Sequence, residues 1–166
     1  MSVPALITER LELLVVTGAV VDAVVSGDLT TLPAGLRAAP GWPTAGTVNG
    51  MRLSPRPESD DAADGGSRLV VARDIGEVIG DLGWKGGPDA DGVAEIGYGL
   101  AAPSRGRGYG TEAVAAFSDW ALGPGGATVL TAQVVPDNLA SRRLLERVGF
   151  RLHRVEPAAC WYRREG

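Results

Sequence analysis

The sequence predicts a single α/β domain of the mixed α+β kind, in which a central sheet of about seven strands is flanked by helices. Its 166 residues, 45% of them hydrophobic, suit one domain with a buried core, so we expect residues 1–166 to form one unit. Strand-like and helix-like segments follow in the order strand, two helices, three strands, helix, strand, helix and two strands. A glycine-rich turn joins the fourth strand to the third helix.

The first half of the chain contains alternating apolar segments and a short helical run that Gly27 is placed to stop. A long segment rich in proline, glycine and acidic residues is expected to be a loop. Trp42 and Met51 within it are expected to dock on the domain, because apolar bulk in a loop tends to pack against something. The predicted elements are a strand at 7–16, helices at 19–26 and 28–38, the loop at 39–66, and strands at 68–73 and 78–85.

The second half alternates strands and helices more regularly. The segment at 128–135 is the most apolar strand and is expected to be central, with Pro136 closing it. Asp137 or Asn138 is placed to cap the last helix, and Gly149 to stop it. The predicted elements are a strand at 93–101, a helix at 111–122, a strand at 128–135, a helix at 139–148, and strands at 150–155 and 158–164.

The turn before the third helix reads Arg-Gly-Arg-Gly-Tyr-Gly over residues 105–110. The first N–H groups of a helix have no internal partner and the helix dipole adds positive charge there, which suits a phosphate. Glycines let the main chain curl around an anion, and Arg105 and Arg107 add charge. The expected ligand is a pyrophosphate. Neither the Walker pattern, which needs a lysine, nor the dinucleotide pattern G-x-G-x-x-G fits these residues.

The pattern that fits is Arg/Gln-x-x-Gly-x-Gly/Ala, which Arg105, Gly108 and Gly110 match. With Gly97-Tyr98 upstream, Thr111-Glu112-Ala113 downstream and the run at 138–150, the chain resembles the GCN5-related N-acetyltransferase (GNAT) superfamily. Thr8-Glu9-Arg10-Leu11 is similar to the opening strand of the ribosomal-protein N-terminal acetyltransferases (RimJ/RimL-like). The resemblance implies a mixed, mostly antiparallel sheet that is splayed in the middle, where the strands at 93–101 and 128–135 part to admit the cofactor.

The resemblance implies acetyl-CoA as co-substrate, with direct transfer of the acetyl group to a primary amine in a ternary complex. The backbone of Leu100, Ala101 and Ala102 would pair with the pantetheine arm, Asn138 would contact the same arm or cap its helix, and Ser141 would lie close to the cofactor sulfur. The residues implied to hold the pyrophosphate are Arg105, Gly106, Arg107, Gly108, Tyr109, Gly110 and Thr111.

Two residues are candidates for the chemistry that the resemblance implies. Glu95 is the candidate base because many members carry a glutamate near this position; the alternative is a surface or salt-bridged glutamate. Many members also place a tyrosine on the last helix to protonate the thiolate, but here that position is Leu145. Ser141 is therefore the substitute candidate, or else a helix-start residue bonded to the backbone. His153 and Cys160 are expected to be structural.

Composition excludes several other classes of function. The net charge of -4 argues against a general nucleic-acid binder, no C-x-x-C pair or similar motif suggests a metal site, and the apolar run at 13–25 is too short to span a membrane. The single cysteine suits a reducing cytoplasm. We expect a small-molecule or peptide amine as acceptor, with a homodimer possible from the resemblance. The competing hypotheses are a non-catalytic acyl-CoA-binding or interaction module and a nucleotide-binding regulator.

Overall fold

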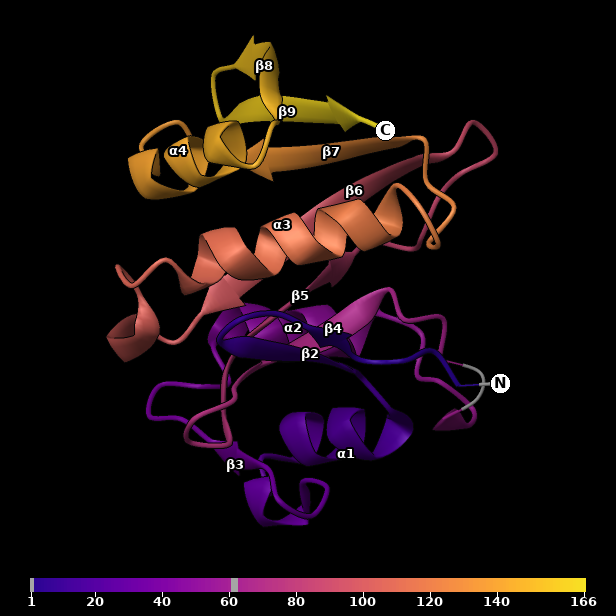
Figure 1. Ribbon diagram of the computed structural model, residues 1–166, viewed down its shortest axis with the longest axis vertical. Coiled ribbons are helices and arrows are strands. Elements are labelled where there is room, and N and C mark those ends of the chain that lie inside the picture. The colour runs from indigo at the N-terminus through magenta and orange to yellow at the C-terminus, as the bar shows by residue number, and fades with distance from the viewer. Residues whose placement is uncertain (1, 61–62) are drawn as a thin grey trace.

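The computed structural model of the protein describes residues 2–60 and 63–166, which form one sheet with helices on both faces (Figure 1). The nine strands of this described part are β1 Leu6–Ile7, β2 Leu11–Val15, β3 Arg37–Ala38, β4 Ser67–Ala72, β5 Glu77–Trp84, β6 Val93–Leu100, β7 Val129–Val134, β8 Arg151–Glu156 and β9 Ala159–Glu165. Its helices are α1 Gly18–Ser26, α2 Ala45–Leu53, α3 Tyr109–Ala121 and α4 Leu139–Arg147, with 3-10 turns η1 Leu29–Thr31 and η3 Ala102–Ser104.

The strands lie in the order β1-β2-β4-β5-β6-β7-β9-β8, and β3 pairs with β5 at one end. Among the strands of the described residues, β6–β7 and β3–β5 are parallel and the other pairs are antiparallel. The parallel ladder between β6 and β7 has four residue pairs, from Val93 with Val129 to Ile96 with Ala132. Beyond these pairs β6 is bonded only to β5, and β7 only to β9. The mixed, mostly antiparallel sheet that splays in its middle is therefore confirmed.

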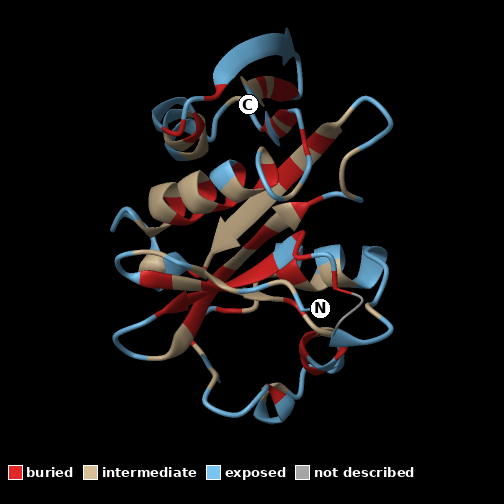
Figure 2. Cartoon of the chain, turned by 45° about the vertical axis from the view of Figure 1, so that its right-hand side comes forward, coloured by how far each residue is buried: buried red, intermediate tan, exposed pale blue. Residues whose placement is uncertain are grey.

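Side chains that alternate along the central strands build a separate core on each face of the sheet. On β4, Val70 and Ala72 join the core beneath α3 and α4, whereas Leu69 and Val71 join the core beneath α1 and α2. Figure 2 shows the buried residues concentrated in the central strands and on the inner faces of the helices. The fully exposed strand β8 lies at the outer edge beyond β9.

The long helix α3 is amphipathic at the spacing predicted from the sequence. Ala113, Val114, Phe117 and Ala121 are buried against the sheet. Phe117 also packs with Trp84 and Trp120 as an aromatic cluster, with ring centroids 5.3–6.1 Å apart. Because α3 rests on this cluster, its N-terminus is held at a fixed place beside the splayed end of β6.

One charged side chain lies entirely inside the core beneath α3. Arg68 of β4 is 0% exposed and donates to three main-chain carbonyls, those of Gly65 at 2.9 Å, Pro4 at 3.0 Å and Leu13 at 3.1 Å. Its guanidinium stacks on the Trp120 ring at 4.6 Å. Arg68 thus ties the N-terminal segment to the sheet.

Three predictions for the N-terminal half were wrong. The expected loop at 39–66 contains α2, which Thr44 begins with a reciprocal capping box to Thr47. The expected helix at 28–38 is a single 3-10 turn followed by β3, because Pro33 and Gly35 cannot continue a helix. The expected strand at 7–16 is divided, since Thr8 accepts a hydrogen bond from the Leu11 N–H and turns the chain between β1 and β2. One acidic residue of the predicted loop, Asp61, lies outside the described residues.

Candidate active site

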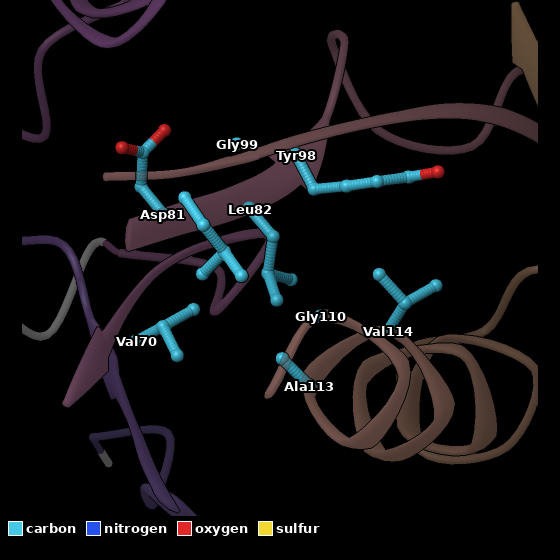
Figure 3. Close-up of a pocket in the computed structure, with 9 residues that line it drawn as sticks. Val70, Asp81, Leu82, Tyr98, Gly99, Gly110, Ala113 and Val114 are labelled. Carbon is cyan, nitrogen blue, oxygen red and sulfur yellow. The ribbon is translucent and has the colours of Figure 1, made fainter. Parts of the chain in front are cut away.

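The splayed ends of β6 and β7 open toward the N-terminus of α3. A small cavity lies on the β6 side of this splay, between strands β4, β5 and β6 and the first turns of the helix (Figure 3). Its lining residues are Val70, Asp81, Leu82, Tyr98, Gly99, Leu100, Gly110, Ala113 and Val114. Residues 97–100 of β6 run along this opening without a β7 partner, so one edge of their backbone faces the cleft.

The predicted pyrophosphate turn forms an uncapped helix start. Gly106 and Gly108 have φ values of 75° and 80°, the left-handed region that glycine adopts without strain. No side chain of the described part caps α3, and its first intrahelical bond runs from Glu112 N–H to the Gly108 carbonyl at 3.1 Å. The amides of residues 109–111 therefore have no intrahelical acceptor, which is the arrangement that binds an anion.

The N-terminal motif Thr8-Glu9-Arg10-Leu11 lies directly against this turn. Arg10 donates from Nη1 to the Arg107 carbonyl at 2.8 Å and from Nε to Glu112 Oε2 at 2.7 Å, and its guanidinium covers the Tyr109 ring at 4.5 Å. Thr8 Oγ1 donates to Glu112 Oε1 at 2.6 Å. The sequence resemblance indicates only that this motif belongs to the opening strand; its contact with the glycine turn, 97 residues away, has no local signal in the sequence.

The carboxylate of Glu112 makes the stability of this contact depend on pH. Burial acts to raise its pKa, but hydrogen bonds from Thr8 and Arg10 and the charge of Arg10 together bring the pKa below its ordinary 4.5. The stability that a lowered pKa contributes is fully present above the unfolded-state pKa and is lost as pH falls through the folded-state pKa.

We therefore expect Glu112→Gln to lower the free energy of unfolding by about 1–2 kcal/mol near neutral pH, and by progressively less as the pH falls below 4.5 and through the folded-state pKa. Urea unfolding of both proteins at each pH measures the difference. The exposed neighbour Glu9, changed to Gln, serves as the control. A loss of the same size at every pH would contradict this role for Glu112.

Three residues expected to pair with pantetheine lie at the end of β6 and already have partners of their own. The Leu100 carbonyl accepts from Arg105 Nε at 3.1 Å, and the Ala101 amide donates to the Ile79 carbonyl at 2.8 Å. Ala102 begins η3. Their contact with the cofactor stays a prediction, as does that of the residues of the turn.

The structure brings Tyr98 of β6 against Ser141 of α4, across the splay. The two hydroxyl oxygens are 2.5 Å apart, and either can donate. Asn138 caps α4 by accepting from the Ser141 amide at 3.2 Å, which fixes the serine in the first turn. Burial raises the pKa of the Tyr98 phenol, opposed by the Ser141 hydrogen bond, so the phenol stays protonated at neutral pH. Leu145, at the position of the expected tyrosine, is fully buried.

Glu95 lies before the splay, opposite Thr131 in the β6–β7 ladder. Its carboxylate pairs with Lys85. The structure does not bring Glu95 into contact with the Tyr98–Ser141 pair through any hydrogen bond among the described residues. Its role as the base stays a prediction.

Residues 25–151 match the family model described as an acetyltransferase (GNAT) domain. The chain belongs to the GNAT acetyltransferase family. The N-acetyltransferase YjdG of Bacillus subtilis (strain 168) is 37% identical over 87 residues, which span 52% of this GNAT chain and 52% of YjdG. The chain thus aligns with only about half the length of that curated relative.

Solved structures of acetyltransferases have the same fold as this GNAT chain. The acetyltransferase of Agrobacterium tumefaciens str. C58 superposes with a TM-score of 0.66 at 29% identity, covering 100% of this chain and 96% of that one. RimL, a ribosomal L7/L12 α-N-protein acetyltransferase solved with coenzyme A, superposes with a TM-score of 0.63 at 18% identity, covering 97% of each chain. These matches confirm the resemblance seen in the sequence, and the RimL match shows a common fold.

Two further properties concern metals and membranes. Within residues 2–60 and 63–166, no three His, Cys, Asp or Glu side chains are grouped so that they could hold a metal ion. None of the described helices has the length and apolar character needed to cross a bilayer.

Proposed function

We propose that this GNAT protein transfers an acetyl group from acetyl-CoA to a primary amine by direct attack in a ternary complex. The observation that carries the proposal is the continuity of two features, the free edge of β6 at residues 97–100 and the uncapped start of α3. Coenzyme A matches both features: the amides of its pantetheine arm can pair with the free edge of β6, and its diphosphate can bind at the start of α3. RimL, which has this fold, was solved with coenzyme A.

The pyrophosphate would rest on the amides of the glycine turn and the first turn of α3. Arg107 is exposed there and adds positive charge at the rim, while Arg105, which is also exposed, reaches back to β6. The pantetheine arm would follow the free edge of β6 toward the splay point at Ile96. This arrangement orients the thioester toward the narrow end of the cleft, and such positioning supplies much of the rate in a bimolecular transfer.

The Tyr98–Ser141 pair would protonate the departing sulfur. The amine nitrogen forms a bond to the acetyl carbon, the carbon–sulfur bond breaks, and the thiolate takes a proton from one of the two hydroxyls. The nitrogen, positively charged after the attack, loses one proton, which restores the hydroxyl. Because the pKa of Tyr98 is raised, the proton is available at neutral pH. Tyr98 would in this way supply the proton that many family members take from a tyrosine at the position of Leu145.

Binding and turnover together test the proposed function. We expect the purified protein to bind coenzyme A in calorimetry and to release free thiol from acetyl-CoA when amines are added, across a panel of alkylamines, polyamines, amino acids and peptides with free N-termini. Coenzyme A binding without amine-dependent thiol release would instead support a non-catalytic acyl-CoA-binding module. Stabilisation by ATP or NAD in preference to coenzyme A would support a nucleotide-binding regulator.

Tyr98→Phe and Ser141→Ala are expected to lower kcat by roughly tenfold while KM for acetyl-CoA changes little, since a thiolate needs less help than poorer leaving groups. Steady-state kinetics with the best amine of the panel measures both constants. Ser26→Ala, at the far end of α1, is the control for loss of a hydroxyl. Unchanged kcat in both variants would remove the pair from this role.

A further inference from the structure

The face of the sheet beneath α2 carries almost no side chains where β5 and β6 meet. The register pairs Asp81 with Gly99 and Gly83 with Gly97, and directly paired residues point to the same face. A Cβ added at Gly99 would meet no heavy atom of the described residues within 4 Å, and one added at Gly97 would meet only Lys85 Cε, at 3.7 Å. The backbone of β6 is thus open on this face.

The carboxylate of Asp81 stands beside this open stretch. Figure 3 shows it pointing away from Leu82, Ala113 and Val114, which line the other face. Its Oδ2 accepts from Trp42 Nε1 at 2.8 Å and from Thr47 Oγ1 at 2.5 Å. Both donors come from the segment that includes α2, and both are more than 95% buried. The carboxylate is therefore fixed in orientation.

The other oxygen, Oδ1, has no hydrogen-bond partner among the described residues. The titratable side chains on the surrounding elements are Arg37 of β3, Arg52 of α2, Arg68 of β4, Glu77 and Lys85 on or beside β5, Glu95 and Tyr98 of β6, and, across the sheet, Tyr109, Glu112 and Asp119 of α3. None of these forms an ion pair with Asp81: Lys85 pairs with Glu95, Arg68 with main-chain carbonyls, and Tyr98 with Ser141. A partly buried carboxylate held by two neutral donors is completed by a cation.

The position of Asp81 matches the place where the amine must attack. In the proposed function the arm of the cofactor follows residues 97–100, and the ladder closes at Ile96, so the thioester lies along this stretch. Gly99 is within it, and Asp81 is its direct neighbour on β5. Glu95 lies within the closed ladder beyond Ile96, and its carboxylate is already paired with Lys85.

We propose that Asp81 binds the protonated amino group of the acceptor through Oδ1 and takes its proton, an inference that rests on the proposed acetyl transfer. The ammonium N–H bond breaks and the proton moves to the carboxylate. The freed nitrogen lone pair then forms the bond to the acetyl carbon while the carbon–sulfur bond breaks, and the thiolate is protonated as described above. The bonded nitrogen loses its remaining surplus proton, which replaces the one that the hydroxyl pair gave to the sulfur. Burial raises the pKa of Asp81, opposed by the hydrogen bonds from Thr47 and Trp42, which moves this base toward neutral pH.

The test is the pH dependence of kcat/KM for two probe amines, 2-phenylethylamine and a peptide with a free alanine N-terminus, in the wild type and Asp81→Asn. If Asp81 takes the proton from the ammonium, kcat/KM of the wild type does not change with pH between the pKa of Asp81 and the pKa of the amine. The variant depends on free amine, so its value rises tenfold per pH unit and is about 100-fold below wild type near pH 7. Asparagine retains an oxygen that can accept from Trp42 and Thr47. If Asp81 has only a structural role, the variant therefore keeps a kcat/KM that does not change with pH.

Methoxyamine is the matched probe because it is neutral near pH 7 and its lone pair is free without prior loss of a proton. Asp81→Asn is expected to lower its acetylation less than about fivefold. Glu77→Gln on the same strand is the control and should retain the wild-type profile. Glu95→Gln is measured in parallel, and a rising slope in that variant with a flat one in Asp81→Asn would assign the base to Glu95 and overturn the inference.

Measurements on the wild type and Glu95→Gln decide the matter if Asp81→Asn does not fold, as judged by its melting curve and coenzyme A affinity. A flat profile with 2-phenylethylamine in both the wild type and Glu95→Gln supports the inference, and a wild-type profile that rises tenfold per pH unit overturns it. Failure of the proposed function looks different: coenzyme A binds, but neither amine nor any member of the panel releases thiol.

Discussion

Replacing Arg68 with alanine is expected to lower the free energy of unfolding by about 3–5 kcal/mol, the cost of a large buried truncation that also leaves carbonyls unpaired. The guanidinium satisfies three carbonyls and covers Trp120, and it is 0% exposed. Burial lowers the pKa of Arg68 to about 10, partly offset by the charge of Asp64. At neutral pH the side chain is still charged, so its hydrogen bonds are intact.

Two further variants separate packing from hydrogen bonding at this position. Arg68→Met keeps most of the volume and the contact with Trp120 but removes the donors, so we expect about half of the loss seen with alanine. Arg52→Ala, on the exposed side of α2, should change the free energy of unfolding by less than about 0.5 kcal/mol. Urea denaturation measures all three. A loss below about 1 kcal/mol in Arg68→Ala would show that Arg68 does not hold the N-terminal segment.

Gly108→Val is expected to weaken coenzyme A binding about 30-fold. Gly108 has a φ of 80° and is the N-cap of α3, and a β-branched residue there costs about 2 kcal/mol of strain or forces the turn to change shape. A Cβ at this position would also meet Arg10 Nη2 at 3.3 Å, so the contact that supports the turn is disturbed as well. Isothermal titration of coenzyme A measures the change.

Gly126→Val is the matched control, because Gly126 also has a positive φ, 82°, with open space around it, and it lies beyond the other end of α3. It should lose similar stability but bind coenzyme A with wild-type affinity. Equal affinities in both variants would show that the glycine turn does not hold the cofactor.

The sequence was sufficient where the determining interactions are local. The turn at 105–110 and the helix after it were predicted because glycine conformations and helix periodicity depend on neighbours in the chain. Asn138, named as one of two possible caps, bonds the Ser141 amide for the same reason. The splay of β6 from β7 could be predicted only from the family resemblance, because no local sequence pattern encodes the residue at which the pairing of two strands stops.

The sequence was insufficient where distant residues meet. Helix α2 contains Gly46 and Gly50 and has a single buried residue, Thr47, so its stability comes from contacts such as Thr47 with Asp81, 34 residues away. Tyr98 meets Ser141 across 43 residues. Asp81 shows in the sequence only as a polar residue within an apolar strand, and its partner Trp42 lies in the predicted loop. A carboxylate flanked by Gly80 and Gly83 in such a strand was the signal that could have found it.

The four-pair ladder between β6 and β7 has a consequence for how the family can diversify. The backbone joins the two halves of the sheet only at the closed end of the cleft, and at the open end they meet through side chains, as where a Cβ at Gly110 would come within 2.8 Å of Leu144 Cδ1. Substitutions on α4 can therefore widen or narrow the channel without breaking a main-chain hydrogen bond. New acyl donors could be accommodated by mutation there while the scaffold keeps its stability.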